Sequence, residues 1–281
     1  MTNAPALMLE IQPGVAALRM SHVEGWAGLV IGSRRTLAID AGKDVDEGAA
    51  IVASSAALGG RSDLLAYTHG HWDHVRGGCA FKSAEIVAHR DAIPMIGVQL
   101  AEERQRAEAS DVPTEAGEPT VVISSAVEFR LGEVEAVLLP TPGHAPGAMS
   151  VFIPAGRILF AGDTVVTGIP PALGDGDSIA LQNTFEALRE MRLDIIVPGH
   201  GPILRSRGAV VEHLTWSIKY LSAVRELIER LRNRRSLDEI VAAVTFDAFI
   251  GARLPIDTHR MVWRHEQVVR RIHDELQGVP G

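Results

Sequence analysis

The chain has 281 residues and a formal net charge of −8, from 35 acidic and 27 basic side chains. This acidic balance disfavours a nucleic-acid partner, and the single cysteine, Cys79, excludes an internal disulfide. The N-terminus lacks a basic region followed by an apolar stretch, and no later apolar run is long enough to span a bilayer, so we expect a cytoplasmic protein without a membrane partner.

The N-terminal part of the chain predicts strands that enclose one helix. Residues 7–40 contain short apolar runs separated by turn signals, which predicts an opening antiparallel meander. Asp44 with Glu47 forms a capping-box pattern ahead of an alanine-rich stretch, so we expect a helix to begin there. The apolar run 64–66 then predicts a buried strand, and Gly70 allows a sharp turn directly after it.

The middle of the chain predicts a second half similar to the first. Residues 121–139 contain two or three strand-like runs, and residues 149–160 predict a hairpin around a Pro-Ala-Gly turn. Residues 178–191 carry apolar side chains at helical spacing, which predicts another helix. This order of strands and helices indicates an α/β fold with both classes of element in one core.

After the last of these strands the pattern becomes helical. An apolar stripe runs from Leu214 to Leu231, a capping-box pattern spans residues 236–239, and a last helix is predicted from about Thr258. We therefore expect a core of residues 1–205 and a helical extension of residues 206–281 that packs on the same domain. The apolar helices of this extension are our candidate surface for a homodimer.

The stretch His69-Gly-His71-Trp-Asp73-His74 places three imidazoles and a carboxylate in six consecutive residues. Neutral imidazole suits zinc, iron or manganese, and a carboxylate adds charge and hardness. Structural zinc sites usually contain more thiolate than one cysteine can supply, so the mixed set indicates a catalytic metal site. A histidine-rich surface loop is the alternative interpretation, but chance rarely produces this spacing.

Three later segments each present one potential ligand among glycines and prolines directly after an apolar run. They are residues 141–147 with His144, residues 160–164 with Asp163, and residues 196–202 with His200. Taken alone, a turn of this kind is more often only a turn. Taken in this order after the histidine cluster, the three segments reinforce one another.

From Asp40 to Pro202 the order of these motifs resembles that of the metallo-β-lactamase fold superfamily of metallohydrolases, over roughly the first 205 residues. The resemblance implies a four-layer αββα sandwich of two mixed sheets, with the metals at one edge between them. By the same resemblance, His69, His71 and His144 would hold a first metal, Asp73, His74 and His200 a second, and Asp163 would bridge them.

This resemblance implies a dinuclear metal-dependent hydrolase that uses a metal-bridged hydroxide to cleave a small ester, thioester or lactone. We expect two Zn²⁺ ions, with Mn²⁺ or Fe²⁺ as alternatives, and Asp73 and Asp163 as catalytic residues. Asp73 would orient the water or shuttle a proton, and Asp163 would bridge the metals. The alternatives are a mononuclear iron oxidoreductase similar to the persulfide dioxygenases, a phosphodiesterase, and a metal-binding protein without catalysis.

The substrate is expected to be a small molecule of the glyoxalase II, lactonase or thioesterase kind. The aspartate at position 163 argues against a true β-lactamase, because the antibiotic-cleaving members of the resembled fold carry a non-carboxylate there. Val166 stands where acyl-homoserine lactonases typically have tyrosine, which weakens the lactonase interpretation. Several apolar residues are candidates for lining the pocket or, equally, for packing in the core or a lid. Residues 99–120 are a candidate lid or, equally, a surface helix and loop. The apolar candidates are Trp26, Trp72 and the segments 168–171 and 249–255.

The six remaining histidines lie outside these motifs. We interpret each as a surface or hydrogen-bonded residue rather than a metal ligand. They are His22, His89, His213, His259, His265 and His273.

Overall fold

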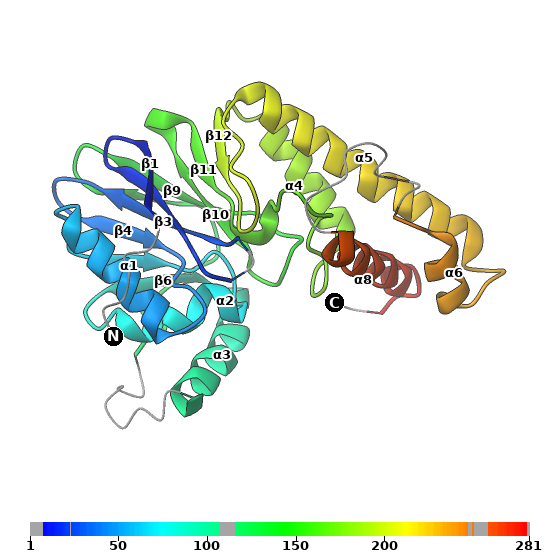
Figure 1. Cartoon of the computed structure of the whole chain (residues 1–281), viewed down its shortest axis with the longest axis horizontal. Coiled ribbons are helices and arrows are strands. Elements are labelled where there is room, and N and C mark those ends of the chain that lie inside the picture. The colour runs from blue at the N-terminus through cyan, green and yellow to red at the C-terminus, as the bar shows by residue number, and fades with distance from the viewer. Residues whose placement is uncertain (1–7, 23, 107–115, 247–248, 250–257, 280–281) are drawn as a thin grey trace.

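The computed structural model describes residues 8–22, 24–106, 116–246, 249 and 258–279 (Figure 1). It contains two sheets packed face to face, with helices on the outer face of each. The predicted α/β class and the four-layer αββα sandwich are therefore confirmed. Among the described residues, none of the helices combines the length and apolar character needed to cross a bilayer.

The first sheet has seven strands whose order in space follows the chain. The strands β1 to β4 pair in antiparallel fashion, as predicted for the opening meander, and β4 to β7 pair in parallel. Their bounds are β1 Met8–Gln12, β2 Val15–Arg19, β3 Trp26–Ile31, β4 Thr36–Ile39, β5 Leu64–Ala66, β6 Glu85–His89 and β7 Val121–Ile123.

The second sheet has five strands in the order β12-β11-β10-β9-β8. Only the β11–β12 pair is parallel, because β12 returns to this sheet after a helix, whereas the hairpin-linked strands are antiparallel. The bounds are β8 Val127–Arg130, β9 Glu135–Pro140, β10 Met149–Ile153, β11 Ile158–Phe160 and β12 Ile195–Val197.

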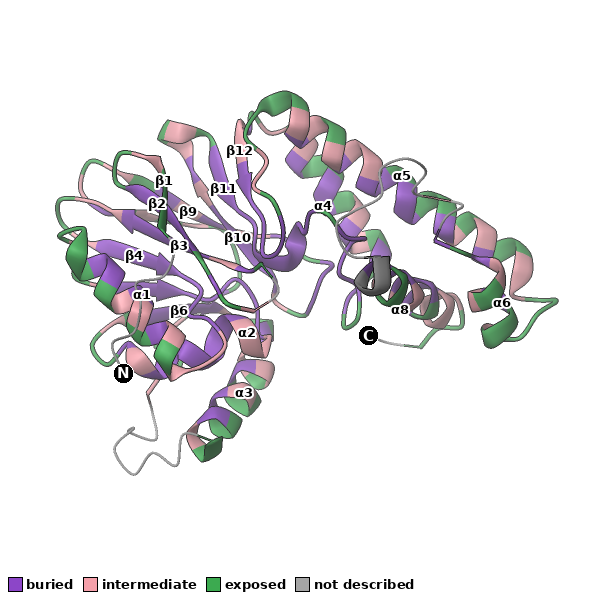
Figure 2. Cartoon of the chain, in the orientation of Figure 1, coloured by how far each residue is buried: buried purple, intermediate pink, exposed green. Residues whose placement is uncertain are grey.

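Alternation along the strands determines which side chains fill the core between the sheets. In β5, Leu64 and Ala66 face the second sheet, whereas Leu65 faces the outer helices. In β11, Ile158 and Phe160 face inward and Leu159 faces outward. Successive side chains of a strand point to opposite faces, and here both faces are covered, so short apolar runs replace an apolar and polar alternation. Figure 2 shows the strands as mostly buried.

Helices cover the two outer faces. The first sheet carries α1 and α3, and the second carries α4 and α5, with α6 and α8 packed beyond them (Figures 1 and 2). The bounds are α1 Val45–Ala57, α2 Trp72–Val75, α3 Ile93–Arg106, α4 Ser178–Glu190, α5 Arg207–Leu231, α6 Leu237–Ala243 and α8 Thr258–Leu276. In the described part of the chain, 3₁₀ turns lie at Arg76–Ala80, Arg90–Ala92, Pro154–Gly156 and Gly162–Thr164.

The two predicted capping boxes differ in the structure. Ser236 and Glu239 form the full reciprocal box at the start of α6. At α1, Asp44 caps the Glu47 amide, but the Glu47 carboxylate accepts from the Lys43 amide and from Ser21 instead of returning to Asp44. Glu47 thus ties the helix to the loop after β2, a tertiary role that the local pattern does not reveal.

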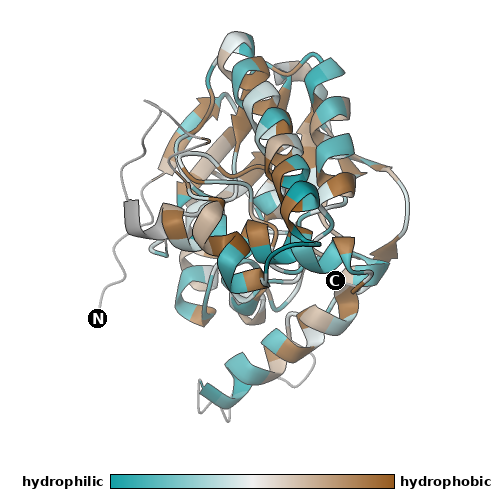
Figure 3. Cartoon of the chain, turned by 90° about the vertical axis from the view of Figure 1, so that its right-hand side faces the viewer, coloured by the Kyte–Doolittle hydropathy of each residue, from teal (hydrophilic) through white to brown (hydrophobic). Residues whose placement is uncertain are grey.

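The C-terminal helices share one apolar cluster with the second sheet. Leu159 of β11 and Ile196 of β12 contact the same cluster as Phe185 of α4 and Leu214 of α5. Figure 3, in which the C-terminal helices face the viewer, shows both hydrophobic and hydrophilic residues on each of them, as amphipathic packing requires. The division at residue 205 stays a prediction.

Candidate metal centre

The ends of four strands position every predicted ligand. His69, His71, Asp73 and His74 follow β5, His144 follows β9, Asp163 follows β11, and His200 follows β12. These strands come from both sheets, so their ends bring distant segments of the chain to one place. Gly199 permits the loop after β12 to approach Asp163 closely, because a Cβ atom there would lie 1.9 Å from Asp163 Oδ1.

The structure brings all seven residues together in two groups. The donor atoms of each group lie within 4.8 Å of one another, one group being His69, His71, His144 and Asp163 and the other Asp73, His74 and His200. The two oxygens of Asp163 face different groups. Its Oδ1 is 3.5 Å from His74 Nε2 and 3.4 Å from His200 Nε2, whereas its Oδ2 is 3.8 Å from His144 Nε2. A carboxylate in this position is placed to bridge two cations.

In four histidines, the ring nitrogen that points away from the other proposed ligands is hydrogen-bonded to an acceptor. We call it the outer nitrogen. His69 Nδ1 donates to Thr68 Oγ1 at 3.0 Å, and His74 Nδ1 donates to Asp40 Oδ2 at 2.8 Å. His144 Nδ1 donates to a backbone carbonyl at 2.9 Å, and His71 Nε2 donates to a carboxylate at 2.9 Å. Each bond assigns the proton to the outer nitrogen, which leaves the lone pair of the other nitrogen directed into the centre.

Asp40 orients two of these histidines through hydrogen bonds. Its carboxylate accepts from the Thr68 amide and hydroxyl and from His74, so it acts on His74 directly and on His69 through Thr68. Asp40 is buried and has a left-handed backbone conformation with φ of 59°. A non-glycine residue held in this region stores strain, which is commonly found at functional sites.

Buried polar atoms in the centre lack partners in a way that fits a cation. His69 Nε2, His74 Nε2 and Asp163 Oδ1 are buried and have no hydrogen-bond partner within the described part of the chain. Leaving such groups unsatisfied costs about 1–3 kcal/mol each. A divalent metal would satisfy all three at once, and the donor set of imidazoles and carboxylates matches zinc and similar ions.

The pKa shifts follow from burial and from the crowding of charge. Burial, with the neighbouring His71, lowers the pKa of His144 to about 3, and burial with His74 lowers that of His69 well below its usual value. These two rings are therefore neutral at pH 7 and able to coordinate a metal. Burial opposes ionisation of Asp163, but His200 and His74 outweigh it and lower the pKa of this carboxyl.

At His74, His200 and Asp73, neighbouring opposite charges outweigh the effect of burial on the pKa. Burial disfavours a charge on His74, yet Asp40 and Asp73 raise its pKa well above the usual value. Burial likewise opposes a charge on His200, but Asp163 and Asp73 raise its pKa. Burial resists ionisation of Asp73, and His74 with His200 lower its pKa to about 2. The carboxylates thus attract positive charge into the centre, and a metal cation would supply it without a proton.

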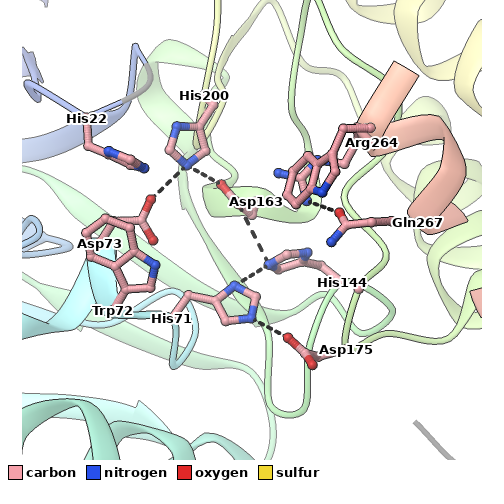
Figure 4. Close-up of a pocket in the computed structure, with 12 residues that line it drawn as sticks. His22, His71, Trp72, Asp73, His144, Asp163, Asp175, His200, Arg264 and Gln267 are labelled. Carbon is pink, nitrogen blue, oxygen red and sulfur yellow. Dashed lines mark hydrogen bonds and ion pairs between the residues drawn. The ribbon is translucent and has the colours of Figure 1, made fainter. Parts of the chain in front are cut away.

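A cavity of about 450 Å³ opens directly onto this centre (Figure 4). It is lined by His22, His71, Trp72, Asp73, His144, Asp163, Gly174, Asp175, His200, Trp263, Arg264 and Gln267. His22, which we interpreted as a surface or hydrogen-bonded residue, lines the cavity, and its ring centroid lies 4.6 Å from that of Trp72.

This lining is more polar than expected. Of the apolar candidates, Trp72 lines the cavity, but the Trp26 indole donates to the Gly201 carbonyl, and Ile169 packs in an apolar cluster. Phe249 packs in the same cluster, and residues 250–255 lie outside the described residues. No described residue of the candidate lid 99–120 lines the cavity either, since α3 continues to Arg106 on the outer face of the first sheet.

The sequence did not single out Asp175, Arg264 or Gln267. Asp175 lies in the turn Gly174-Asp-Gly-Asp177, a short distance after Asp163, which is a weak signal on its own. Arg264 and Gln267 come from α8, far along the chain. Their only local signal is the polar side of an amphipathic helix, which is normally interpreted as solvent-facing.

Comparisons with known proteins concern the family and the fold of this chain. The sequence model of the metallo-beta-lactamase superfamily matches residues 22–200. A hydroxyacylglutathione hydrolase from Thermosynechococcus vestitus is 28% identical over 141 residues, which cover 50% of this chain and 50% of that protein. A second hydroxyacylglutathione hydrolase, from Methylococcus capsulatus, is 30% identical over 135 residues, which cover 48% of this chain and 46% of that protein. The chain thus matches about half the length of these curated relatives.

Solved structures show the same fold at low identity. The stereoselective inverting sec-alkylsulfatase of a Pseudomonas species has a TM-score of 0.72 at 18% identity, covering 97% of this chain and 50% of that one. A metallo-beta-lactamase family protein from Thermus thermophilus has a TM-score of 0.69 at 17% identity, and the match covers 96% of this chain and 95% of that one. Because the family model covers more than half of the sequence and the fold agrees, this chain belongs to the metallo-beta-lactamase superfamily.

Proposed function

We propose that this protein is a metal-dependent hydrolase of small esters, thioesters or lactones. The observation that supports this most is the set of inward lone pairs on four histidines, each fixed by a hydrogen bond at the opposite ring nitrogen. Similarity to proteins named hydroxyacylglutathione hydrolase supports a hydrolase, and a thioester is one of the substrate classes that we expect.

The proposed metals are two Zn²⁺ ions. The first would be held by His69, His71 and His144, the second by Asp73, His74 and His200, with Asp163 between them. When bound, such a pair supplies a water of lowered pKa and polarises the scissile carbonyl. The positions of the two Asp163 oxygens, one facing each group, support a shared carboxylate.

The residues of the chain would bind and orient the reactants. Asp73 has a pKa of about 2 and lines the cavity, so at neutral pH it remains a hydrogen-bond acceptor that can orient the attacking water. Figure 4 shows His22 and Trp72 on one side of the centre and Arg264 with Gln267 on the other. A substrate between these two sides would lie against His71 and His144 with its scissile bond at the centre.

Metal content tests the proposed centre. Elemental mass spectrometry of purified protein should give two zinc or manganese ions per chain, falling towards one in His74→Ala, because His74 belongs to the second group only. A single iron that the substitution leaves in place would instead favour the oxidoreductase similar to persulfide dioxygenases. The intact second group, with Asp73 and His200 beside His74, is the observation that favours the hydrolase.

Turnover tests the shared carboxylate. Asp163→Asn keeps the shape of the side chain but removes one anionic ligand oxygen, so we expect turnover to fall by about 100-fold or more, with the fold retained. Asp194→Asn is the matched control, because Asp194 pairs with Arg157 on an exposed surface. Wild-type turnover in Asp163→Asn would contradict the dinuclear proposal.

A panel of thioesters, lactones, phosphodiesters and β-lactams, assayed on protein of known metal content, would identify the reaction. Cleavage of phosphodiesters alone would favour the phosphodiesterase alternative. We propose a small-molecule substrate in each case, with neither nucleic acid nor membrane as partner, since a net charge of −8 repels phosphate backbones. A homodimer through the apolar faces of the C-terminal helices remains part of this proposal.

A further inference from the structure

Two tryptophans from distant parts of the chain line the same cavity as the metal centre. Trp72 belongs to α2 and Trp263 to α8, and among the described lining residues these two supply the large apolar side chains. Figure 4 shows Trp72 on one side of the centre and, on the other, Arg264, which follows Trp263 on α8. The elements that carry the two indoles therefore lie on opposite sides of the cavity.

Trp72 is held in place by a buried arginine. The guanidinium carbon of Arg76 lies over the indole, 5.5 Å from the ring centroid. Arg76 Nη2 in turn donates to Gln99 Oε1 at 2.7 Å and to the carboxylate of Glu102, and both acceptors belong to α3. A guanidinium fixed by two acceptors is a firm support for an aromatic face, so the wall formed by Trp72 keeps its position.

Trp263 lies towards the solvent end of the cavity. It is 51% exposed, whereas Asp163 and His144 are 5% and 2% exposed, so the cavity has buried ligand donors at its base and an indole at its mouth. The guanidinium carbon of Arg264 lies 5.0 Å from the ring centroid of Trp263, a contact that favours one orientation of the indole. A single exposed apolar side chain on an open surface needs no explanation. An exposed indole that lines a cavity continuous with a candidate reaction centre indicates contact with a ligand.

The docking of α8 fixes Trp263 relative to the metal centre. Just before Trp263, Met261 is buried in one apolar cluster with Val166 of the loop that follows β11 and carries the proposed bridging aspartate. At the other end of the helix, Glu275 accepts from the amide and hydroxyl of Ser178 at 2.7 and 2.6 Å. The indole is therefore held at one distance from the centre by contacts at both ends of its helix.

Two indoles across one cavity suit a planar apolar group. Aromatic rings that pack in stacked or edge-to-face arrangements are stabilised beyond the effect of the area that they bury. The cavity has a volume of about 450 Å³, in the range of sites that hold drug-sized ligands and more than a short acyl chain fills. A ring on the substrate would occupy the space between the scissile group and the mouth.

We propose that Trp72 and Trp263 form an aromatic subsite, so that the natural substrate is an ester or thioester with an aromatic ring a few bonds from the scissile carbonyl. This inference rests on the proposed hydrolase function and narrows its substrate class. The scissile carbonyl lies at the buried polar base, and the ring lies at the mouth against the indoles. The two ends of the substrate thus match the two ends of the cavity.

Matched substrates test the subsite. The N-acetylcysteamine thioesters of hydrocinnamic, cyclohexanepropionic and propionic acids share their leaving group and acyl chain, and they differ in having an aromatic ring, a saturated ring or no ring. The zinc-loaded wild type should prefer the aromatic thioester to the propionyl thioester by about 10- to 100-fold in kcat/KM, with the saturated ring between them. Equal kcat/KM for the three, or a preference for the saturated ring, would overturn the proposal.

Trp263 is the residue to change, because Trp72 lies between the proposed ligands His71 and Asp73 in sequence. Trp263→Ala should lower the ratio of kcat/KM for the aromatic to the propionyl thioester by about 10-fold, and Trp263→Phe should restore part of it. Val262→Ala is the matched control, because Val262 is the neighbouring exposed apolar residue and does not belong to the described lining of the cavity. It should keep the wild-type ratio. If Trp263→Ala keeps it too, the proposal is wrong.

Self-association through Trp263 is the competing explanation of its exposure. Analytical ultracentrifugation of the wild type and of Trp263→Ala gives the oligomeric state of both. A dimer that becomes a monomer in Trp263→Ala, with an unchanged substrate ratio, would assign the indole to an interface between two copies and overturn the subsite. A ratio that falls while the oligomeric state stays the same supports it.

Equilibrium binding separates the subsite from the hydrolase proposal. Calorimetry with hydrocinnamate and propionate on the same zinc-loaded proteins should show tighter binding of hydrocinnamate to the wild type, and Trp263→Ala should reduce the difference. If no thioester is cleaved but this difference is found, the aromatic subsite stands and the hydrolase function falls. If the thioesters are cleaved without preference and both acids bind equally, the hydrolase function stands and the subsite falls.

Discussion

At the scale of single residues, the hydrogen-bond acceptors of the proposed ligand histidines differ in how firmly they are held. Asp40 is buried and accepts three hydrogen bonds, so it orients His74 and, through Thr68, His69 as one unit. Asp175 serves His71 alone, and its side chain is 59% exposed. The first group of ligands therefore has one member whose orientation depends on a carboxylate at the mouth of the cavity.

Replacing Asp175 should weaken metal binding without unfolding the protein. In Asp175→Ala, His71 loses the acceptor that fixes its tautomer, and metal affinity should fall by about 10- to 100-fold, as for other carboxylates that orient a ligating histidine. Competition with a chromophoric chelator measures this affinity. Asp175→Asn, whose carbonyl oxygen can still accept, should recover part of it, and Asp238→Asn on α6 serves as an exposed control. Unchanged affinity in Asp175→Ala would show that the His71 contact is incidental.

Some residues of the centre can be identified from their neighbours in sequence, whereas others are placed there only by tertiary packing. His69, His144 and His200 could be singled out from sequence because each directly follows an apolar strand and is surrounded by turn-forming residues. Asp175 and Arg264 could not, because their positions relative to the centre depend on how a loop and a distant helix dock. Of the described apolar candidates, Trp72 lines the cavity, whereas Trp26, Ile169 and Phe249 pack against apolar clusters, which was the other interpretation of these residues.

At the scale of secondary-structure elements, most strands and helices were predictable because both faces of each sheet are buried and the helices are amphipathic, although β6 was not assigned from the sequence. The tertiary contacts that these elements make were not predictable from the sequence. Glu47 illustrates this, since it fits a capping box in sequence but bonds Ser21 in the structure. The candidate lid illustrates it too, because α8 rather than α3 contributes to the wall of the cavity.

The helix α8 also contains a buried histidine that should make stability depend on pH. His265 Nδ1 accepts from the Tyr220 hydroxyl and its Nε2 donates to the Val244 carbonyl, both at 2.7 Å. Burial lowers the pKa of His265, so in the acidic range the unfolded chain, with a histidine pKa of about 6.5, binds more protons than the folded one. This contribution to stability is complete above pH 6.5 or so and is lost as the pH falls through the interval between the two pKa values.

His265→Gln isolates this effect, because glutamine keeps one acceptor and one donor but does not titrate. Urea unfolding of the two proteins at pH 7.5 and pH 5.5 should show that the wild type loses more free energy of unfolding on acidification than the variant does. The ligand histidines titrate in both proteins, so their contribution cancels in the comparison. Parallel pH dependences would mean that His265 is protonated in the folded state as easily as in the unfolded chain.

At the scale of the whole molecule, the C-terminal helices cover an apolar surface that the core cannot cover itself. Leu181, Phe185 and Leu188 of α4 are buried in one cluster with Val210 and Leu214 of α5. Exposing one such large side chain costs about 1.5–3 kcal/mol, whereas a typical domain is stable by only about 5–15 kcal/mol in total. The extension is therefore expected to be part of the cooperative unit, although it follows every proposed ligand residue in sequence.

A chain cut after residue 205 tests this expectation. It keeps all seven proposed ligands but exposes the outer face of α4 and loses α8, so we expect a product that binds hydrophobic dyes and lacks a sharp thermal transition. The full chain should unfold in one transition that coincides by fluorescence and by circular dichroism, the behaviour of a single cooperative domain. A truncated chain that retained a sharp transition and bound metal would show that residues 206–281 form a separate module. The wall of the cavity that contains Arg264 would then be free to move independently of the metal centre, and α8 could not fix the position of a substrate.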